Sequence, residues 1–423
     1  EHSRQVFAEQ EAAVLAGRGL EALRSLPDRP ERAQQELALQ VTLGLALRTI
    51  KGFSNPETGK AYARARELCK QIGDTPHLFP VLFGLWEFDQ STAQLETAIE
   101  LAQLLLAAAG EDQSLRLVAH NVMADQLTWL GRFVDAREHL EQGIALYDSE
   151  RHSSNVYNYG YDSGVACLSF GSIVLWHLGY PDQALKMGEQ ASDLASQLPH
   201  PLNLALAASF AAWHYSLAGS MKAAQEQADA AIAISEQYDI AMFLAWGKLM
   251  RGWALIGQGE IEDGITIARQ GINEWRASGT LLATSWCLGI LAQGERRAGR
   301  IEESLALLTE ALDFASTAGE HFYEAELLRL RGALLLESDD GRSTLEAEQC
   351  FHQAIALARQ QRAKSFELRA VMSLARLLQQ RGEEAEAQQM LAEIYGWFTE
   401  GFETTDLKDA KALLDELSFN REK

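Results

Sequence analysis

The ten residues NYGYDSGVAC, at positions 158–167, combine an acid, a serine, a cysteine and two tyrosines. An acid and a hydroxyl group can support hydrolysis when a histidine lies beside them and acts as the base. The nearest histidines in the sequence are His152 and His177, ten residues before and fifteen residues after Asp162. This spacing places no nucleophile beside a base. A hydrolase that uses Asp162 is therefore the least favoured function for this chain.

The rest of the sequence lacks the common motifs of catalysis and cofactor binding. The patterns GxxxxGK[ST], GxSxG, HExxH and GxGxxG do not occur. The four cysteines are separated by 98, 120 and 63 residues, so we expect neither a zinc site nor a disulfide framework, and a cytoplasmic location fits best. We therefore predict a non-catalytic protein with no catalytic residues, no metal and no cofactor.

Composition narrows the class of partner. The net charge of −22 disfavours nucleic acid and anionic membrane surfaces, because phosphate binding needs clustered lysine and arginine. No apolar run approaches the ~18 residues of a membrane span. A chain of 423 residues is too long for one ordinary core, so it holds several domains or a repeat array.

A repeat of about 40 residues decides between these two options. A small residue stands about five positions after a glycine, often again twelve positions after it, and usually seven positions before it. Small side chains let two helices cross closely, and the glycine ends the first helix. The pattern resembles the tetratricopeptide (TPR) repeat, which is usually ~34 residues long, and it predicts an all-α, right-handed α-solenoid. The glycines are Gly131, Gly179, Gly219, Gly259, Gly299, Gly341 and Gly382.

We expect one TPR-like superhelical domain over residues 1–417, with nine to ten helix pairs. It comprises N-terminal helices in 1–50, helix-pair repeats in 51–394 and a capping segment in 395–417, before a tail in 418–423. Within it, Asn55 and Pro56 are expected to open a helix. Trp397, Phe398 and Phe402 give the cap an apolar face, which could alternatively serve self-association. The start in mid-pattern without methionine suggests a piece of a longer protein.

First-helix positions thirteen and six before the turn glycine usually face the concave groove of such a repeat, and position ten adds three polar candidates. Four tryptophans from three adjacent repeats fall there, and tryptophan suits binding pockets because it is large, apolar and carries a donor. Two interpretations stay open: these residues line a binding groove, or they pack between helices. The candidate groove residues are Asn121, Asp125, Ser169, Trp176, Ser209, Trp213, Trp246, Lys248, Arg251, Trp253, Trp286 and Gln293.

The opening stretch lies in an enlarged loop of this array. The spacing from Gly131 to Gly179 is 48 residues, and the surplus falls in 148–164. Insertions in solenoids often map to the binding face. Tyr159, Tyr161 and Asp162 are therefore either ligand contacts or parts of a longer joint between helices.

Several stretches resemble the C-terminal repeat region of large bacterial signal-transduction ATPases with numerous domains. They include DSGVACLSF with LWHLGYPDQAL in 162–185, LAWGKLMRGWALIGQG in 244–259 and YGWFTEGFETTDLKDAKALLDEL in 395–417. Many members carry a class III adenylate or guanylate cyclase or a DNA-binding domain, then an AAA-type ATPase, upstream of the repeats. The resemblance implies a cytoplasmic sensor arm that binds a protein, a peptide or a small molecule. The alternative is a freestanding TPR adaptor that holds a peptide segment.

Overall fold

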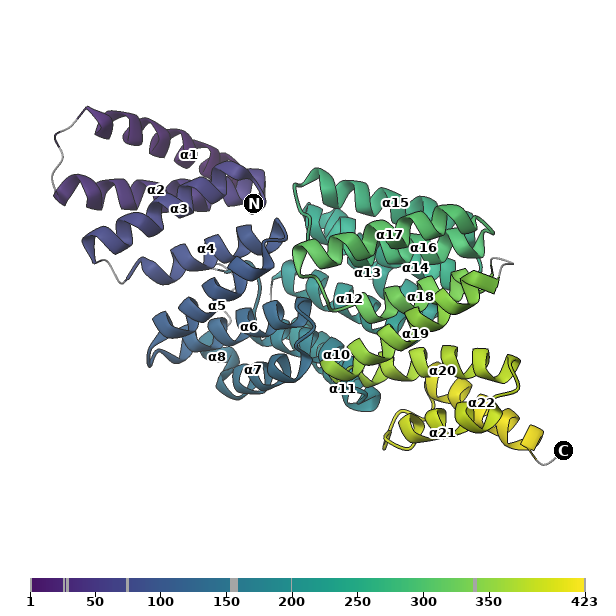
Figure 1. Ribbon diagram of the computed structural model, residues 1–423. Helices are drawn as coiled ribbons and strands as arrows, with labels where there is room; N and C mark the ends of the chain where they lie inside the picture. Colours follow the sequence, from purple (N-terminus) through teal and green to yellow (C-terminus); the bar gives the residue numbers. More distant parts are fainter. Residues whose placement is uncertain are drawn as a thin grey trace. The chain divides into compact units, whose positions relative to one another are not determined.

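The computed structural model describes residues 2–25, 27, 30–73, 76–152, 159–198, 200–337 and 341–421. Every regular element within these residues is a helix, and successive helices pack in antiparallel pairs (Figure 1). The predicted all-α solenoid of TPR-like helix pairs is therefore confirmed. None of the described helices combines the length and the apolar character needed to cross a membrane.

The chain divides into two compact units, and the first comprises residues 1–126 and 274–282. Each helix from α1 to α4 packs on the next one along the chain. Hydrogen bonds join residues 274–282 to this unit: Leu281 N and Leu282 N donate to Ser91 O over 2.7 and 3.2 Å, and the hydroxyls of Ser54 and Thr280 lie 2.9 Å apart. The helices are α1 (His2–Arg24), α2 (Pro30–Lys51), α3 (Pro56–Ile72), α4 (Leu78–Ser91), α5 (Leu95–Ala109) and most of α6 (Gln113–Trp129).

The start of α3 is the one predicted from the sequence. The Asn55 side chain accepts a hydrogen bond from Glu57 N over 2.9 Å, and Pro56 occupies the first turn, where no amide hydrogen is needed. This helix ends at Gly73 in the left-handed conformation, with a φ of 69°. The cap and the terminating glycine therefore fix both ends of α3.

Unit 2 comprises residues 127–273 and 283–423 and holds the more regular repeats. Each repeat is a pair of helices, called here its first and second helix, and the two kinds alternate along the chain. The last helix of the unit is α22. The first helices are α10 (Ser163–Leu178), α12 (Pro201–Leu217), α14 (Ala241–Gln258), α16 (Thr284–Arg297), α18 (Glu324–Leu335) and α20 (Lys364–Gln380). The others are α7 (Phe133–Leu146), α8 (Ser149–His152), α11 (Pro181–Gln197), α13 (Met221–Tyr238), most of α15 (Ile261–Ala277), α17 (Ile301–Ala318), α19 (Gly341–Gln361), α21 (Glu384–Tyr395) and α22 (Thr405–Arg421).

The turn glycines follow the prediction in all repeats but one. Six of them, from Gly131 to Gly299 and Gly382, have φ values between 70° and 96°, in the left-handed region that favours glycine. Gly341 is different, because it is the first residue of α19 while α18 already ends at Leu335. The prediction of a helix-ending glycine was wrong there. This repeat also has Leu334 where the other repeats have a small residue, so its register was already irregular.

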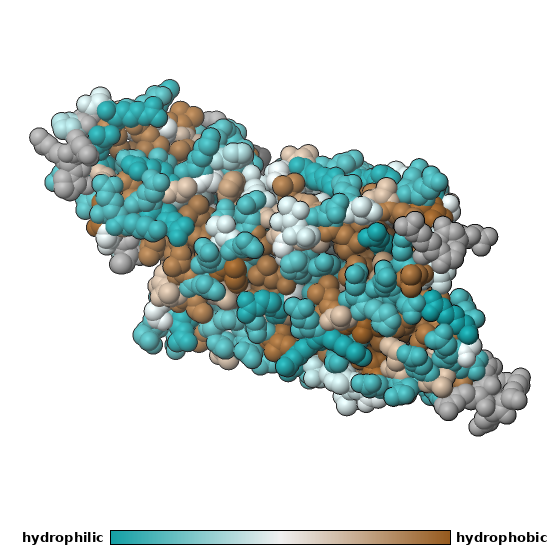
Figure 2. Space-filling view, in the orientation of Figure 1, coloured by the Kyte–Doolittle hydropathy of each residue, from teal (hydrophilic) through white to brown (hydrophobic). Residues whose placement is uncertain are grey.

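Small residues make the helix pairs close, most clearly where α14 crosses α15. A Cβ atom added to Gly252 would lie 2.6 Å from both Ala268 N and Gly264 O. One added to Gly271 would lie 2.6 Å from Ala245 O. The backbones therefore touch without intervening side chains, as the predicted small-residue register requires. Hydrophilic side chains predominate on the outer surface over α15 and α17 (Figure 2).

The C-terminal segment packs on the last repeats. Phe398 is buried in the core formed by α19 to α22, whereas Trp397 and Phe402 are 36% and 43% exposed. The helix α22 continues to Arg421, so residues 418–421 are helical and residues 422–423 of the expected tail lie outside the described residues.

Candidate functional site

The inner row of first helices in unit 2 is closed. Each of α10, α12, α14, α16 and α18 packs on the next first helix, and α20 returns to contact α10. Figure 1 shows α10 and α20 side by side. The predicted concave groove is therefore occupied by the side chains of the first helices themselves, and these are mainly aromatic.

Trp213 is at the centre of this inner aromatic cluster. Its ring centroid lies 4.9 Å from that of Trp286, 5.6 Å from Trp246, 5.8 Å from Trp129 and 5.8 Å from Phe322. The rings meet at tilted, edge-on or offset angles, which aromatic pairs prefer. Residues more than 150 positions apart in the sequence thus share one core.

The five candidate tryptophans are all buried in this arrangement. Trp213 and Trp286 have no exposed surface, and Trp176, Trp253 and Trp246 are 2%, 4% and 7% exposed. Their rings contact other rings of the described residues. This geometry is what the packing interpretation describes, and ligand binding by these residues stays a prediction.

Several buried polar atoms on the same helices lack a hydrogen-bond partner among the described residues. A buried donor or acceptor without a partner costs about 1–3 kcal/mol, so such atoms are rare in folded proteins. Ser169 and Ser209 occupy the same repeat position in α10 and α12, ten residues before the turn glycine. The atoms are Trp213 Nε1, Trp286 Nε1, His177 Nε2, His214 Nδ1, Ser169 Oγ and Ser209 Oγ.

His177 presents an acceptor to this cluster. Its Nδ1 lies 2.8 Å from Ile173 O, and a carbonyl can only accept, so Nδ1 carries the proton and Nε2 has the lone pair. Burial lowers the pKa of His177 to about 3, which keeps the ring neutral. The imidazole also stacks on Phe133, with ring centroids 4.4 Å apart.

A polar group centred on Arg369 borders the aromatic cluster. Arg369 Nε lies 2.8 Å from Asp406 Oδ2, Nη2 donates to Leu217 O over 2.6 Å, and the guanidinium lies 4.9 Å from the Trp176 ring centroid. Burial opposes ionisation of the neighbouring Glu326, but Arg329 and Arg369 outweigh it and lower the pKa of that carboxyl group. One arginine thereby joins α20 to α10, α12 and α22.

Arg369 is not among the groove residues predicted from the sequence, although the sequence holds a signal for it. The residue stands thirteen positions before Gly382, which is the groove position used to select Trp246 and Trp286. Applying the same register to the last repeat would have identified it.

The remaining groove candidates lie in other surroundings. Lys248 and Arg251 are half-buried on the flanks of α14: Lys248 Cβ approaches Gly271 of α15, and Arg251 Nε lies 3.3 Å from Asp229 Oδ1 of α13. Gln293 Nε2 is 3.4 Å from the hydroxyl of Tyr323. Asn121 and Asp125 are buried in α6 and belong to unit 1.

In the enlarged loop, Asp162 caps α10. Its Oδ1 accepts hydrogen bonds from Gly164 N and Val165 N over 2.9 and 3.0 Å, and Tyr147 donates to its Oδ2 over 3.1 Å. Tyr159 is buried and Tyr161 is half-buried. Residues 153–158 of the loop lie outside the described residues, and ligand binding by the loop stays a prediction.

Comparison with known proteins gives the fold. No family model matches the chain. An uncharacterized protein of Rhizobium meliloti (strain 1021) is 23% identical over 352 residues, which cover 81% of this chain and 33% of that protein. The chain thus spans about a third of the length of this relative.

Two solved structures are similar over most of the chain. The crystal structure of a Rap protein complexed with competence and sporulation factor aligns with a TM-score of 0.51 and 15% identity, covering 90% of this chain and 96% of that one. A signal transduction ATPase with numerous domains and a tetratricopeptide repeat sensor, from Pyrococcus horikoshii, aligns with a TM-score of 0.46 and 13% identity, covering 91% and 54%. The likeness to the Rap protein agrees with the helix-pair solenoid described above.

Proposed function

We propose that the chain is a non-catalytic recognition arm that binds a protein, peptide or small-molecule ligand on the inner face of unit 2. The observation that supports this is the concentration of unpartnered buried polar atoms on α10, α12 and α16. Packing alone accounts for buried rings, but it gives no reason to bury indole and hydroxyl donors without acceptors. A ligand would supply the missing partners.

The atoms define the chemistry of that ligand. The indole donors of Trp213 and Trp286 and the hydroxyls of Ser169 and Ser209 suit carbonyl or carboxylate oxygens. Nε2 of His177 suits a donor. A ligand of this kind combines oxygen acceptors with apolar surface that fits among the rings.

Binding at this face requires the closed inner row to open. The contact between α10 and α20 and the bonds of Arg369 hold it shut. A ligand that binds only the open arrangement shifts the equilibrium toward it by its differential affinity. The arm would thereby convert binding into a rearrangement of helices.

We further propose that this rearrangement regulates an ATPase or a class III nucleotidyl cyclase in the same protein. The greater length of the curated relative and the resemblance to signal-transduction ATPases support an arm attached to other domains. The ligand must then prefer one arrangement of arm and enzyme.

The test removes one indole donor at a time and keeps an aromatic ring at the position. We would titrate the purified chain with fractionated metabolite and peptide pools, follow tryptophan fluorescence, and identify the bound species by mass spectrometry. Trp213→Phe and Trp286→Phe each remove an N–H, so each should weaken binding about tenfold, the effect of roughly 1.4 kcal/mol. Trp397→Phe, on the exposed cap, is the control. Equal affinity in all three variants would mean that Trp213 and Trp286 only pack in the core and donate no hydrogen bond to a ligand.

A further inference from the structure

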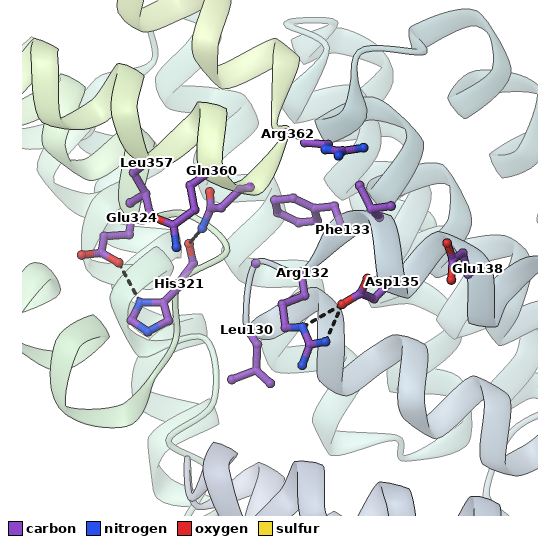
Figure 3. Close-up of a pocket in the computed structure, with 13 residues that line it drawn as sticks. Leu130, Arg132, Phe133, Asp135, Glu138, His321, Glu324, Leu357, Gln360 and Arg362 are labelled. Carbon is purple, nitrogen blue, oxygen red and sulfur yellow. Dashed lines mark hydrogen bonds and ion pairs between the residues drawn. The ribbon is translucent and has the colours of Figure 1, made fainter.

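A pocket of about 700 Å³ opens in unit 2 where three turns of the chain meet. Its walls come from the start of α7, from the turn before α18 and from the end of α19, including Phe133, His321 and Arg362. Figure 3 shows these side chains around the opening. The volume is within the range of roughly 300–1,000 Å³ that is usual for ligand sites.

Gln361 lines this pocket and has an unpartnered buried acceptor. The residue is 9% exposed, and its Nε2 donates to His321 O over 2.8 Å. Rotating the amide by half a turn would set two oxygens against each other, so Oε1 is fixed on the other side. There it has no hydrogen-bond partner among the described residues. A Cβ at position 131 would lie 2.4 Å from Nε2, so Gly131 makes room for this arrangement.

The charges that line the pocket leave one cation available. Arg132 is paired with Asp135 over 2.8 Å, and His321 is paired with Glu324 over 2.7 Å. Figure 3 shows Arg362 beyond Phe133, apart from both pairs. The Arg362 side chain is exposed and forms no ion pair within the described residues.

The backbone at Arg362 is also unusual. Its φ of 55° lies in the left-handed region, and glycine occupies the corresponding turn at Gly279 and Gly319 in the two preceding repeats. A long cationic side chain therefore stands where glycine would be the less strained choice.

We infer that this pocket binds a ligand in which an amide N–H lies next to a carboxylate. The N–H donates to Gln361 Oε1, and the carboxylate pairs with the guanidinium of Arg362. Both the C-terminus of a peptide and an N-acylated amino acid have this chemistry. Glu138, which also lines the pocket, repels a second negative charge and so favours a ligand with a single carboxylate.

Calorimetric titration of the full chain tests this. The probes are N-acetyl-trialanine, its C-terminal amide, and N-acetyl-alanine. We expect the tripeptide acid to bind at least tenfold more tightly than its amide. N-acetyl-alanine distinguishes a peptide C-terminus from an N-acylated amino acid as the ligand. If it binds as tightly as the tripeptide acid, the pocket contacts only the terminal residue. If it binds more weakly, the pocket also contacts the preceding residues of a peptide. Either result supports the shared chemistry.

Arg362→Gly is the most informative variant, because glycine relieves the left-handed φ and the protein should remain folded. It should lower the affinity for the acid about tenfold. Lys222→Gln, which removes the same charge from the exposed side of α13, should leave binding unchanged, as should Trp213→Phe, which keeps this site separate from the inner cluster. Equal binding of acid and amide, unchanged binding by Arg362→Gly, or no saturable heat with any probe at millimolar concentration would overturn the inference.

Discussion

Glu320 ties one repeat to the next through a single carboxyl group. It is fully buried in the turn before α18, and it accepts hydrogen bonds from Ala283 N over 2.7 Å and from Ser285 N over 3.1 Å, as well as from the Ser285 hydroxyl. These groups are at the start of α16, so Glu320 supplies the helix cap that the local sequence lacks. Burial raises the pKa of Glu320 to about 7, although the hydrogen bonds act in the opposite direction.

This pKa predicts how stability depends on pH. The pKa of an unfolded glutamate is about 4.3, so between roughly pH 4.5 and 7 the folded state holds a proton that the unfolded state has lost. The free energy of unfolding should therefore fall as pH rises through this range, by on the order of 1 kcal/mol per pH unit, and level off above it. In Glu320→Gln this slope should be much smaller, as measured by urea denaturation at several pH values.

Two comparisons make that experiment decisive. His321, whose pKa is raised by its hydrogen bond to Glu324, loses its proton with the same sign, so some slope remains in the variant. Glu302→Gln, on the exposed side of α17, should behave like the parent chain. A parent slope retained in full by Glu320→Gln would show that the group is not protonated when folded.

At the residue scale, the sequence predicts which side chains have useful chemistry better than it predicts which groups surround them in the fold. The register groups Trp213, Trp246 and Trp286, whose rings contact one another in the structure. Their further contacts with Trp129 and Phe322, which bury the rings, carry no signal in the register. Glu320 and the backbone amides that donate to it, Ala283 N and Ser285 N, are 35 or more residues apart in the sequence, and no periodicity marks such a pair. Gln361 likewise depends on a turn 230 residues away at Gly131.

At the scale of the element, the crossing of α14 and α15 predicts the effect of a single methyl group. Alanine in a helix is favoured over glycine by about 1 kcal/mol. In Gly252→Ala, however, the Cβ would approach two backbone atoms at 2.6 Å, so the helices must move apart. Because overpacking costs typically ~1–3 kcal/mol, we expect net destabilisation and a lower midpoint of thermal unfolding.

Gly17→Ala is the matched control for that substitution. Position 17 is in the interior of α1, where an added Cβ meets no atom within 4 Å. The same change should therefore leave stability unchanged or raise it by about 0.5–1 kcal/mol. Opposite signs at the two positions would attribute the difference to helix crossing, and equal signs would argue against it.

The helix pairs are the part of the fold that the sequence predicts best. Small residues and turn glycines repeat at nearly constant spacing, and both follow directly from close packing of neighbours in the chain. The register fails at Gly341, where Leu334 replaces a small residue and α18 has only 12 residues. The spacing of small residues and turn glycines therefore predicts the pairing of consecutive helices wherever these residues are present.

At the scale of unit 2, the closure of the inner row cannot be read from such patterns. It joins residues roughly 150 to 220 positions apart: Ser365 Oγ donates to Trp176 O over 2.5 Å, Arg369 to Leu217 O, and Gly401 N to Asp182 Oδ2 over 3.0 Å. We refer to these three contacts as the seam. The seam decides whether the aromatic cluster is a core or an accessible surface.

Arg369→Ala should open the seam. It would leave Asp406 without its cation, remove one of the two arginines beside Glu326 and remove the contact with the Trp176 ring. Because the pair with Asp406 is only partly buried, we expect a loss of about 1–3 kcal/mol, the cost of leaving a polar group unpaired. Hydrogen exchange should rise in α10, α20 and α22 well before it rises in α14 and α16, and acrylamide should quench more of the tryptophan fluorescence.

Two further variants separate loss of the seam from general loss of stability. Arg381→Ala removes an arginine from the end of α20, where it pairs with Glu348, and should leave both measurements near those of the parent chain. In Arg369→Ala with Asp406→Asn, one uncompensated charge is gone, so part of the protection should return. If exchange instead rises evenly over all helices of unit 2, the unit unfolds as a whole, and the inner face has no separate route by which a ligand could enter.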